Sequence, residues 1–436
     1  MLAHNAKEAE SGPEKANKMD DAIYYGNYCY IHPSVFFYLK RIYKLTDLYS
    51  RLTDLNNLYE AFLRCKSGVD WKESVQRYEC HVFEKLTKLK TALETQTYRQ
   101  KPFFEFDLCE RGKIRHIKSM HISDRVLQRA LCNFVLNPEL SRYLIYDNGA
   151  SMKNKGIDFS RRRVKTHLTK YYRKYGKSGY VLLIDFSKYF DSIPHETLKQ
   201  KLAEKIHDEK VMNLVCYLID CFEGEKGVGI GSQLSQTVGI FYPTELDQFC
   251  KTVKGCKYYG RYMDDTYIIH PDKNFLKKLL EEYCEIADSL GIVINKKKTQ
   301  IVSLKAGFKF LQMRYRLTDS GKVLVVPVRK SITRERRRLR KFYNLYHQKM
   351  ITVEQVHEQY NSWRGNIVKY DCYRSVRNTD LLLNYLFGGK NEKERRRKSG
   401  RERNGTFTHR RTDKRTYRRT RCSKFGYWRL EGCKML

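Results

Sequence analysis

Aromatic and β-branched residues surround a pair of aspartates in residues 257–270, where apolar and polar positions form the clearest local pattern in the chain. Strand-forming residues lead into Asp264 and Asp265 and continue after them, in the sequence KYYGRYMDDTYIIH. Such residues favour strands and Asp tolerates tight turns, so the segment predicts a β-hairpin with an acidic tip. Adjacent carboxylates repel each other, so the tip is either a solvated turn or one wall of a cation site.

The chain before this hairpin combines helical and strand patterns. Residues 33–100 show the spacing of apolar positions that is typical of helices. Residues 103–108 and 113–117 then alternate as two strands joined by a turn. An amphipathic helix is expected over residues 123–136, with its end near Pro138.

Strands and helices continue to alternate in the second half of the chain. The apolar run YVLLI predicts a buried strand at residues 180–186. Helices are expected at about residues 194–206, 209–222 and 273–290. Residues 331–387 have a helical and basic pattern. The order of elements therefore predicts an α+β protein.

The charge balance indicates a polyanionic partner. The chain of 436 residues has 85 Lys and Arg against 49 Asp and Glu, a formal net charge of +36. Basic side chains near phosphates release condensed counterions, so an excess of this size favours nucleic acid. The last 47 residues contain 18 basic and 5 acidic residues with few aliphatics, which predicts a disordered basic arm.

Membrane insertion and a disulfide framework are not expected. No apolar run approaches the roughly 20 residues that a spanning helix needs, and the polar N-terminus does not resemble a signal peptide. The 13 cysteines are scattered without zinc-ligand spacing. We expect reduced, mostly buried thiols in a cytoplasmic protein, and two further thiols, Cys422 and Cys433, lie in the basic arm.

A third carboxylate, Asp185, ends the buried strand at residues 180–186. A strand-terminal Asp by itself is often a helix cap or a turn residue. Taken with Asp264 and Asp265, it predicts a site for two divalent cations, because bridging carboxylates from separate segments hold such pairs about 3.5–4 Å apart.

Four motifs in order resemble the palm of a reverse transcriptase. They are DFSKYFD at 185–191, GSQLSQ at 231–236, YMDD at 262–265 and INKKKT at 294–299. The sequence FKFL at 308–311 resembles the start of the family's primer-grip hairpin. The resemblance covers about residues 100–390 and implies a right-hand polymerase with fingers, a palm of antiparallel sheet with helices, and a helical thumb.

The resemblance assigns roles to the acidic motif and its neighbour. Asp185 and Asp264 would be the principal ligands of two Mg²⁺ ions, with Mn²⁺ as an alternative, and Asp265 would assist. Phe190, five positions after Asp185, matches the steric gate that excludes a ribose 2′-hydroxyl. Ordinary core packing is the alternative role for Phe190.

Three basic residues match positions that handle the triphosphate. Lys113 and Arg115 match the fingers residues that grip the incoming nucleotide, although a solvated basic hairpin would look the same. Lys298 matches a general acid for the departing pyrophosphate. Lys296 and Lys297 lie beside it, so a solvated charge run is the alternative.

The turn before the palm helix departs from the common pattern. Many relatives have Pro-Gln-Gly there, whereas this chain has Gly229, Ile230 and Gly231. Together with Ser235 and Gln236, the turn resembles that of diversity-generating-retroelement and defence-associated bacterial reverse transcriptases. Ile230, Gly231 and Gln236 are accordingly expected to contact substrate, and the missing Gln predicts reduced fidelity.

The expected organisation has four parts. A disordered N-terminus and helical extension (1–100) precede the fingers and palm (101–305), the primer grip and thumb (306–389) and the basic arm (390–436). The Arg-rich helix near residue 334 is suited to following an A-form duplex, although a solvated face is the alternative for any single Arg. No endonuclease, integrase or RNase H domain is expected in the remaining length.

The expected activity is RNA-directed DNA polymerisation in an antiphage defence system or retroelement. Its partners would be an RNA template, nascent DNA and deoxynucleoside triphosphates, with a noncoding RNA or accessory protein as further candidates and no membrane. Untemplated or protein-primed synthesis and low-fidelity retroelement mutagenesis are alternatives. A nucleic-acid-binding protein with a degenerate polymerase fold is another.

Overall fold

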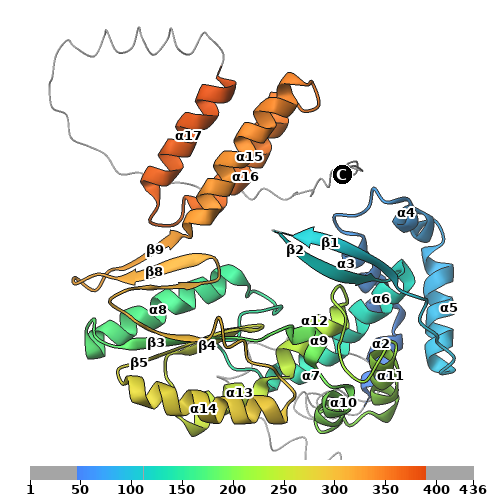
Figure 1. The fold of residues 1–436 in the computed structure, drawn as a ribbon. Coiled ribbons are helices and arrows are strands. Elements are labelled where there is room, and N and C mark those ends of the chain that lie inside the picture. The colour runs from blue at the N-terminus through green and yellow to red at the C-terminus, as the bar shows by residue number, and fades with distance from the viewer. Residues whose placement is uncertain (1–46, 111, 389–436) are drawn as a thin grey trace, which may run out of the picture.

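The computed structural model describes residues 47–110 and 112–388 (Figure 1). The expected N-terminal disorder up to about residue 20 and the expected basic arm at 390–436 lie outside these residues, as do Cys422 and Cys433. Within the described part of the chain, no helix is long and apolar enough to cross a membrane.

A four-stranded antiparallel sheet forms the centre of the palm. Its strands, in the order β4-β5-β3-β6, have these bounds: β4 (Tyr259–Tyr262), β5 (Asp265–His270), β3 (Tyr180–Asp185) and β6 (Gln300–Ser303). The apolar residues of β3 are buried on both faces of the sheet. Successive side chains of a strand point to opposite faces, so the continuous apolar run in the sequence follows from two-sided burial.

Helices cover both faces of this sheet. On one face α8 (Ile157–Tyr175) shares a hydrophobic core with Val181 and Leu183. On the other face α14 (Lys273–Ser289) shares the main core with Leu182 and Ile184. Figure 1 shows α8 and α14 on opposite sides of the strands. This two-sided packing fixes the position of the strand end that carries Asp185.

The helical part of the palm lies between β3 and β4 in the chain. Its helices are α9 (Tyr189–Ser192), α10 (His195–Ala203), α11 (Glu209–Asp220), α12 (Gln233–Phe241), α13 (Thr244–Gln248) and a π-helical turn η3 (Phe249–Val253). The predicted helices at 194–206, 209–222 and 273–290 are confirmed, as is the helix after the Gly-rich turn.

The fingers consist of a hairpin on a base of helices. The hairpin pairs β1 (Phe104–Glu110) with β2 (Lys113–Ser119), as the sequence predicts. The helical segments at its base are α2 (Leu48–Thr53), α3 (Leu55–Lys66), α4 (Glu73–Glu79), α5 (Val82–Glu94), α6 (Ile122–Ala130), η1 (Leu131–Leu136), α7 (Asn137–Leu140) and η2 (Ser141–Tyr143).

The primer-grip sheet and the thumb complete the described chain. The sheet has β7 (Phe308–Phe310), β8 (Met313–Leu317) and β9 (Val323–Pro327), and the thumb has α15 (Arg329–His347), α16 (Val353–Ile367) and α17 (Tyr373–Phe387). Alternate residues of β8 are buried against α8, and the residues between them are exposed. The mixture of helices and antiparallel sheets confirms the α+β fold with fingers, palm and helical thumb.

Two details of the helices differ from the sequence-based expectations. The helix that begins at Ile122 does not end near Pro138, because a π-helical turn and α7 continue it through that proline. Pro138 lies in the first turn of α7, directly after the π-helical turn. Helix α8 was not predicted at all.

The expectation of mostly buried thiols is wrong for the described cysteines. All of them are free, but only four are buried: Cys132, Cys250, Cys256 and Cys372. The others are half-buried or exposed, with Cys80 and Cys109 on the surface.

Candidate active site

The acidic hairpin forms as the sequence predicts. β4 and β5 are antiparallel, and Tyr262 pairs with Asp265 across the turn. Met263 and Asp264 form the turn itself, and Met263 has a φ of 54°, in the left-handed region. A non-glycine residue rarely adopts this conformation, so the surrounding structure must stabilise the turn.

Three carboxylates meet at this end of the sheet. Asp185, the last residue of β3, lies opposite Asp265 in the register of β3 and β5. Burial raises the pKa of Asp264 above its ordinary value, and the negative charge of Asp185 raises it further, whereas Lys298 and Arg115 act in the opposite direction. The effect of Asp185 on the pKa of Asp264 shows that the structure brings together residues 79 positions apart in the sequence.

Asp185 is held from the loop that follows α14. Lys298 Nζ lies 2.6 Å from both carboxylate oxygens of Asp185, and Asn295 Nδ2 donates to Oδ1 at 3.0 Å. The Asn295 backbone N–H also donates to the Asp185 carbonyl at 2.8 Å. The predicted Lys298 is therefore in the site, paired with a carboxylate.

The residues of the site fit a divalent cation of the Mg²⁺ type. Among the described residues, no group of three or more His, Cys, Asp and Glu side chains is arranged to hold a metal ion by itself. Mg²⁺ seldom uses such a group, since one or two carboxylates, waters and substrate phosphates suffice. Asp185 and Asp264 supply the hard oxygen donors, and the Lys298 ammonium on Asp185 shows that this carboxylate attracts a cation.

A large basic cleft opens above the carboxylates. Its volume is about 2320 Å³, and Asp185, Asp264 and Asp265 form part of its wall. Basic residues from the primer grip and thumb form much of the rest: Lys309, Arg314, Lys322, Arg329, Lys330, Arg334, Arg336 and Arg337. In Figure 1 the hairpin β1–β2 and the helices α15–α17 stand on different sides of the palm. The cleft has the charge and size for a polyanion.

A family comparison identifies this arrangement. The sequence model described as reverse transcriptase (RNA-dependent DNA polymerase) matches residues 99–315. The chain contains a reverse transcriptase domain. The match covers the fingers hairpin, the palm with its three aspartates, and the primer grip through most of β8. A domain of this kind is an RNA-directed DNA polymerase, a nucleotidyltransferase.

Solved structures similar to the chain include telomerases from Candida. Telomerase from Candida albicans in complex with a fragment of telomeric RNA is 13% identical, with a TM-score of 0.43 and coverage of 66% of this chain and 59% of that one. Apo telomerase from Candida tropicalis is 14% identical, with a TM-score of 0.40 and coverage of 52% and 48%. The chain thus spans about half to 60% of these telomerase chains. No curated protein matches it in sequence.

Phe190 lies beside the reverse transcriptase motif but outside the lining of the large cleft. Its half-buried ring packs on Gly239 of α12, where a Cβ would lie only 2.9 Å from Phe190 Cε1. Tyr189, next to it, is buried and donates from its hydroxyl to the Gly239 carbonyl at 2.7 Å. The gate role of Phe190 remains a prediction.

The glycine-rich turn of the reverse transcriptase domain contacts the fingers through its main chain. The Lys118 N–H donates to the Ile230 carbonyl at 3.1 Å, and Ile230 forms a parallel bridge with Ile117. Gly231 has a φ of +123°, and a Cβ there would lie 3.0 Å from the Lys118 carbonyl oxygen. Gln236 is exposed on α12. The structure does not place these three residues in the large cleft, so their substrate contacts remain predictions.

The two fingers residues have different outcomes. Arg115 lines the cleft with the three aspartates. The backbone of Lys113 begins β2, but its side chain lies outside what the structure describes. The cleft residues Lys309 and Arg314 are not among the site residues expected from the sequence. Their alternation with the buried residues of β7 and β8 is a signal that could have identified them.

Proposed function

We propose that this protein synthesises DNA on an RNA template from deoxynucleoside triphosphates, with two divalent cations at the acidic end of the palm sheet. The observation that carries the proposal is the convergence of Asp185 and Asp264 on the wall of the basic cleft. Burial and the negative charge of Asp185 raise the pKa of Asp264, so the charged form of this carboxylate is unfavourable without a cation, which supports a role in cation binding.

Asp185 and Asp264 would hold the cations, and Asp265 would assist from the opposite strand. When bound, two Mg²⁺ ions supply activation of a primer 3′-hydroxyl and neutralisation of charge on the triphosphate. Arg115 reaches the cleft from the fingers, where a guanidinium is suited to phosphate oxygens. Lys298 is close enough to the carboxylates to serve as a proton donor to the leaving pyrophosphate.

The thumb and primer grip would bind the template–primer duplex. Buried Ile332, Leu339 and Phe342 attach one face of α15 to the protein, which leaves Arg334 and Arg337 exposed in the cleft. Cationic side chains along a groove follow a phosphate backbone without reading its sequence. The RNA template and nascent DNA are the partners that this surface fits.

The finer biological assignment is a bacterial retroelement or antiphage defence system. The Gly229-Ile230-Gly231 turn supports it, since Ile stands where many relatives have Gln. A template and variable-repeat pair beside the gene would favour retroelement mutagenesis. A noncoding RNA in a defence cluster would favour defence.

Primer extension tests the biochemical proposal. Purified full-length protein is incubated with a primed RNA template, deoxynucleoside triphosphates and Mg²⁺, and the products are sequenced. Products complementary to the template support the proposal. Products unrelated to the template would instead indicate untemplated synthesis, and DNA covalently attached to the protein would indicate protein priming. Absence of any product, with nucleic-acid binding retained, would favour the binding protein.

A further inference from the structure

Arg261 is a wholly buried cation directly before the acidic motif. Its side chain and that of Asp247 are both 0% exposed, and they form a two-point ion pair with Nε–Oδ1 and Nη2–Oδ2 distances of 2.8 and 2.6 Å. Burial of such a pair is unfavourable unless further hydrogen bonds satisfy its remaining donors and acceptors. The partners of those donors therefore indicate what Arg261 does.

The remaining donors of Arg261 reach two elements of the active site. Nη1 donates to the Met263 carbonyl at 3.2 Å, and Nη2 donates to the Ile240 carbonyl of α12 at 2.8 Å. Met263 is the left-handed residue immediately before Asp264. The planar guanidinium thus ties the turn that carries Asp264 to α12 and to Asp247 of α13, and the single ammonium of a lysine cannot reproduce this fork.

Asp247 is itself fixed by a second residue of β4. The Tyr259 hydroxyl donates to Asp247 Oδ1 at 2.5 Å, and Tyr259 is fully buried on the same strand as Arg261. The carboxylate therefore receives bonds from two residues of β4 and cannot rotate without breaking one of them. Its orientation determines that of the guanidinium.

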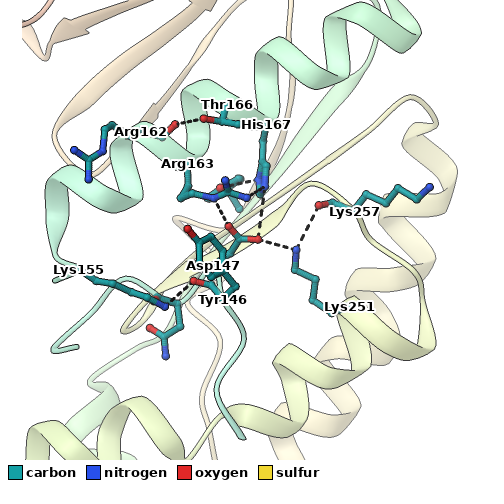
Figure 2. Close-up of polar contacts among 11 residues, drawn as sticks. Tyr146, Asp147, Lys155, Arg162, Arg163, Thr166, His167, Lys251 and Lys257 are labelled. Atoms are coloured by element: carbon teal, nitrogen blue, oxygen red, sulfur yellow. Dashed lines mark hydrogen bonds and ion pairs between the residues drawn. The ribbon is translucent and has the colours of Figure 1, made fainter. Parts of the chain in front are cut away.

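The main chain of Arg261 is held separately by the loop beside β4. Arg261 N–H donates to the Asp147 carbonyl at 3.3 Å, and Gly149 N–H donates to the Arg261 carbonyl at 3.2 Å. Figure 2 shows Asp147 surrounded by cationic groups: Arg163 Nε at 2.5 Å and Lys251 Nζ at 2.9 Å. This contact covers the outer edge of β4, so the strand has fixed neighbours on both edges.

We propose that Arg261, oriented by Asp247, is a positioning residue that holds the Met263–Asp264 turn in the conformation that binds divalent cations. Without its bond to the Met263 carbonyl, the left-handed residue would relax and Asp264 would leave its place beside Asp185. Replacement of a residue that orients a metal ligand through a hydrogen bond typically lowers metal affinity about 10–100-fold. The inference rests on the proposed function of the three aspartates.

The test is Mn²⁺ binding to the full-length protein without nucleotide or nucleic acid, measured by the loss of the electron paramagnetic resonance signal of free Mn²⁺. Arg261→Lys keeps the buried charge but not the fork, and we expect its Mn²⁺ dissociation constant to rise about 10–100-fold. Tyr259→Phe removes one hydrogen bond to Asp247. It should also raise the Mn²⁺ dissociation constant, but by less than Arg261→Lys does. Tyr171→Phe is the control, because its hydroxyl donates to the Ser178 carbonyl before the start of β3, at the opposite end of that strand from Asp185.

Two further measurements separate the outcomes: circular dichroism shows whether each variant is folded, and primer extension shows whether the wild type is a polymerase. A folded Arg261→Lys protein with wild-type Mn²⁺ affinity would overturn the proposal, whatever its activity. If Arg261→Lys does not fold, Tyr259→Phe decides, and wild-type Mn²⁺ affinity in that folded variant would overturn it too. Primer extension by the wild type is scored independently: its absence contradicts the proposed polymerase, whereas a changed Mn²⁺ affinity in the variants still supports positioning.

Discussion

Asp185 lies directly opposite Asp265 in the antiparallel ladder of β3 and β5, at the end of the sheet where Asp264 forms the turn. The register places the last residue of one strand beside the first residue of the other. Each strand is fixed by apolar residues packed on both faces, so the core of the palm determines where the carboxylates meet.

Replacement of Lys298 should identify which of the three neighbouring lysines acts in the site. Lys298 Nζ contacts both oxygens of Asp185, whereas Lys296 and Lys297 are exposed beside it. We expect Lys298→Ala to lower the turnover rate about 100-fold, in the range of general acid catalysis. Steady-state primer extension measures this, with Lys296→Ala as the matched control. Equal losses in both variants would show that only the local charge matters.

Phe190→Val should weaken the exclusion of ribonucleotides. The ring packs on Gly239 of α12, so a smaller side chain removes bulk without displacing backbone. If Phe190 is the gate, the ratio of deoxynucleotide to ribonucleotide efficiency should fall about 10–200-fold. Competitive incorporation measures that ratio, and Tyr189→Phe is the neighbouring aromatic control. Reduced stability with an unchanged ratio would assign Phe190 to core packing.

Ile230→Gln should lower the error rate severalfold. The Ile230 carbonyl accepts a hydrogen bond from the Lys118 N–H of β2, and the substitution leaves this backbone contact in place. A polar side chain there would add a hydrogen-bonding check on the nucleotide and template. Sequencing of extension products gives the error rate, with Ile230→Val as the control. Equal error rates in all three proteins would contradict this explanation.

His167 makes the stability of the palm depend on pH. Its pKa is lowered from 6.5 to about 4, chiefly by burial and also by the cations Arg163 and Lys251, although Asp147 acts in the opposite direction. The unfolded chain therefore binds more protons between these values, so stability is complete above about pH 6.5 and is lost as the pH falls toward about 4. The loss should reach roughly 3 kcal/mol.

Urea unfolding of the protein between pH 4 and pH 7 measures this dependence. His167→Gln should reduce the slope of the unfolding free energy against pH, because the titrating group is gone. His207→Gln replaces an exposed histidine and should leave the slope unchanged. An unchanged slope in the His167 variant would show that other groups cause the pH dependence.

The sequence predicts those parts of the fold that have a strong local signal. The run at β3, the acidic hairpin and the helices of the palm follow from apolar spacing and turn residues. Helix α8 is different. Its buried face consists of Val164, Leu168 and Tyr171, and the many basic residues between them obscure this apolar periodicity in the sequence. The continuation through Pro138 depends on a π-helical turn, which local propensity does not reveal.

The residues of the candidate site likewise divide into those that the sequence predicts and those that it does not. Asp185, Asp264 and Lys298 were predicted from motif order, and the structure brings them together. Arg261 was missed, since a single Arg in an aromatic strand looks like a surface residue until the fold buries it. Its partner Asp247 belongs to a helix that no motif marks. Long-range pairs of this kind depend on tertiary packing, which one sequence does not show.

The central claim is that Asp264 holds cations for RNA-templated DNA synthesis, and the rate of primer extension against Mg²⁺ concentration tests it most directly. Asp264→Asn should lower the rate by more than about 100-fold, beyond the effect of replacing a group that only orients a ligand. Its folded state should be at least as stable as the wild type, because burial already raises the pKa of Asp264. Asp191→Asn, an exposed neighbour of the motif, should extend primers normally. A folded Asp264→Asn protein that extends the primer at the wild-type rate would contradict the claim.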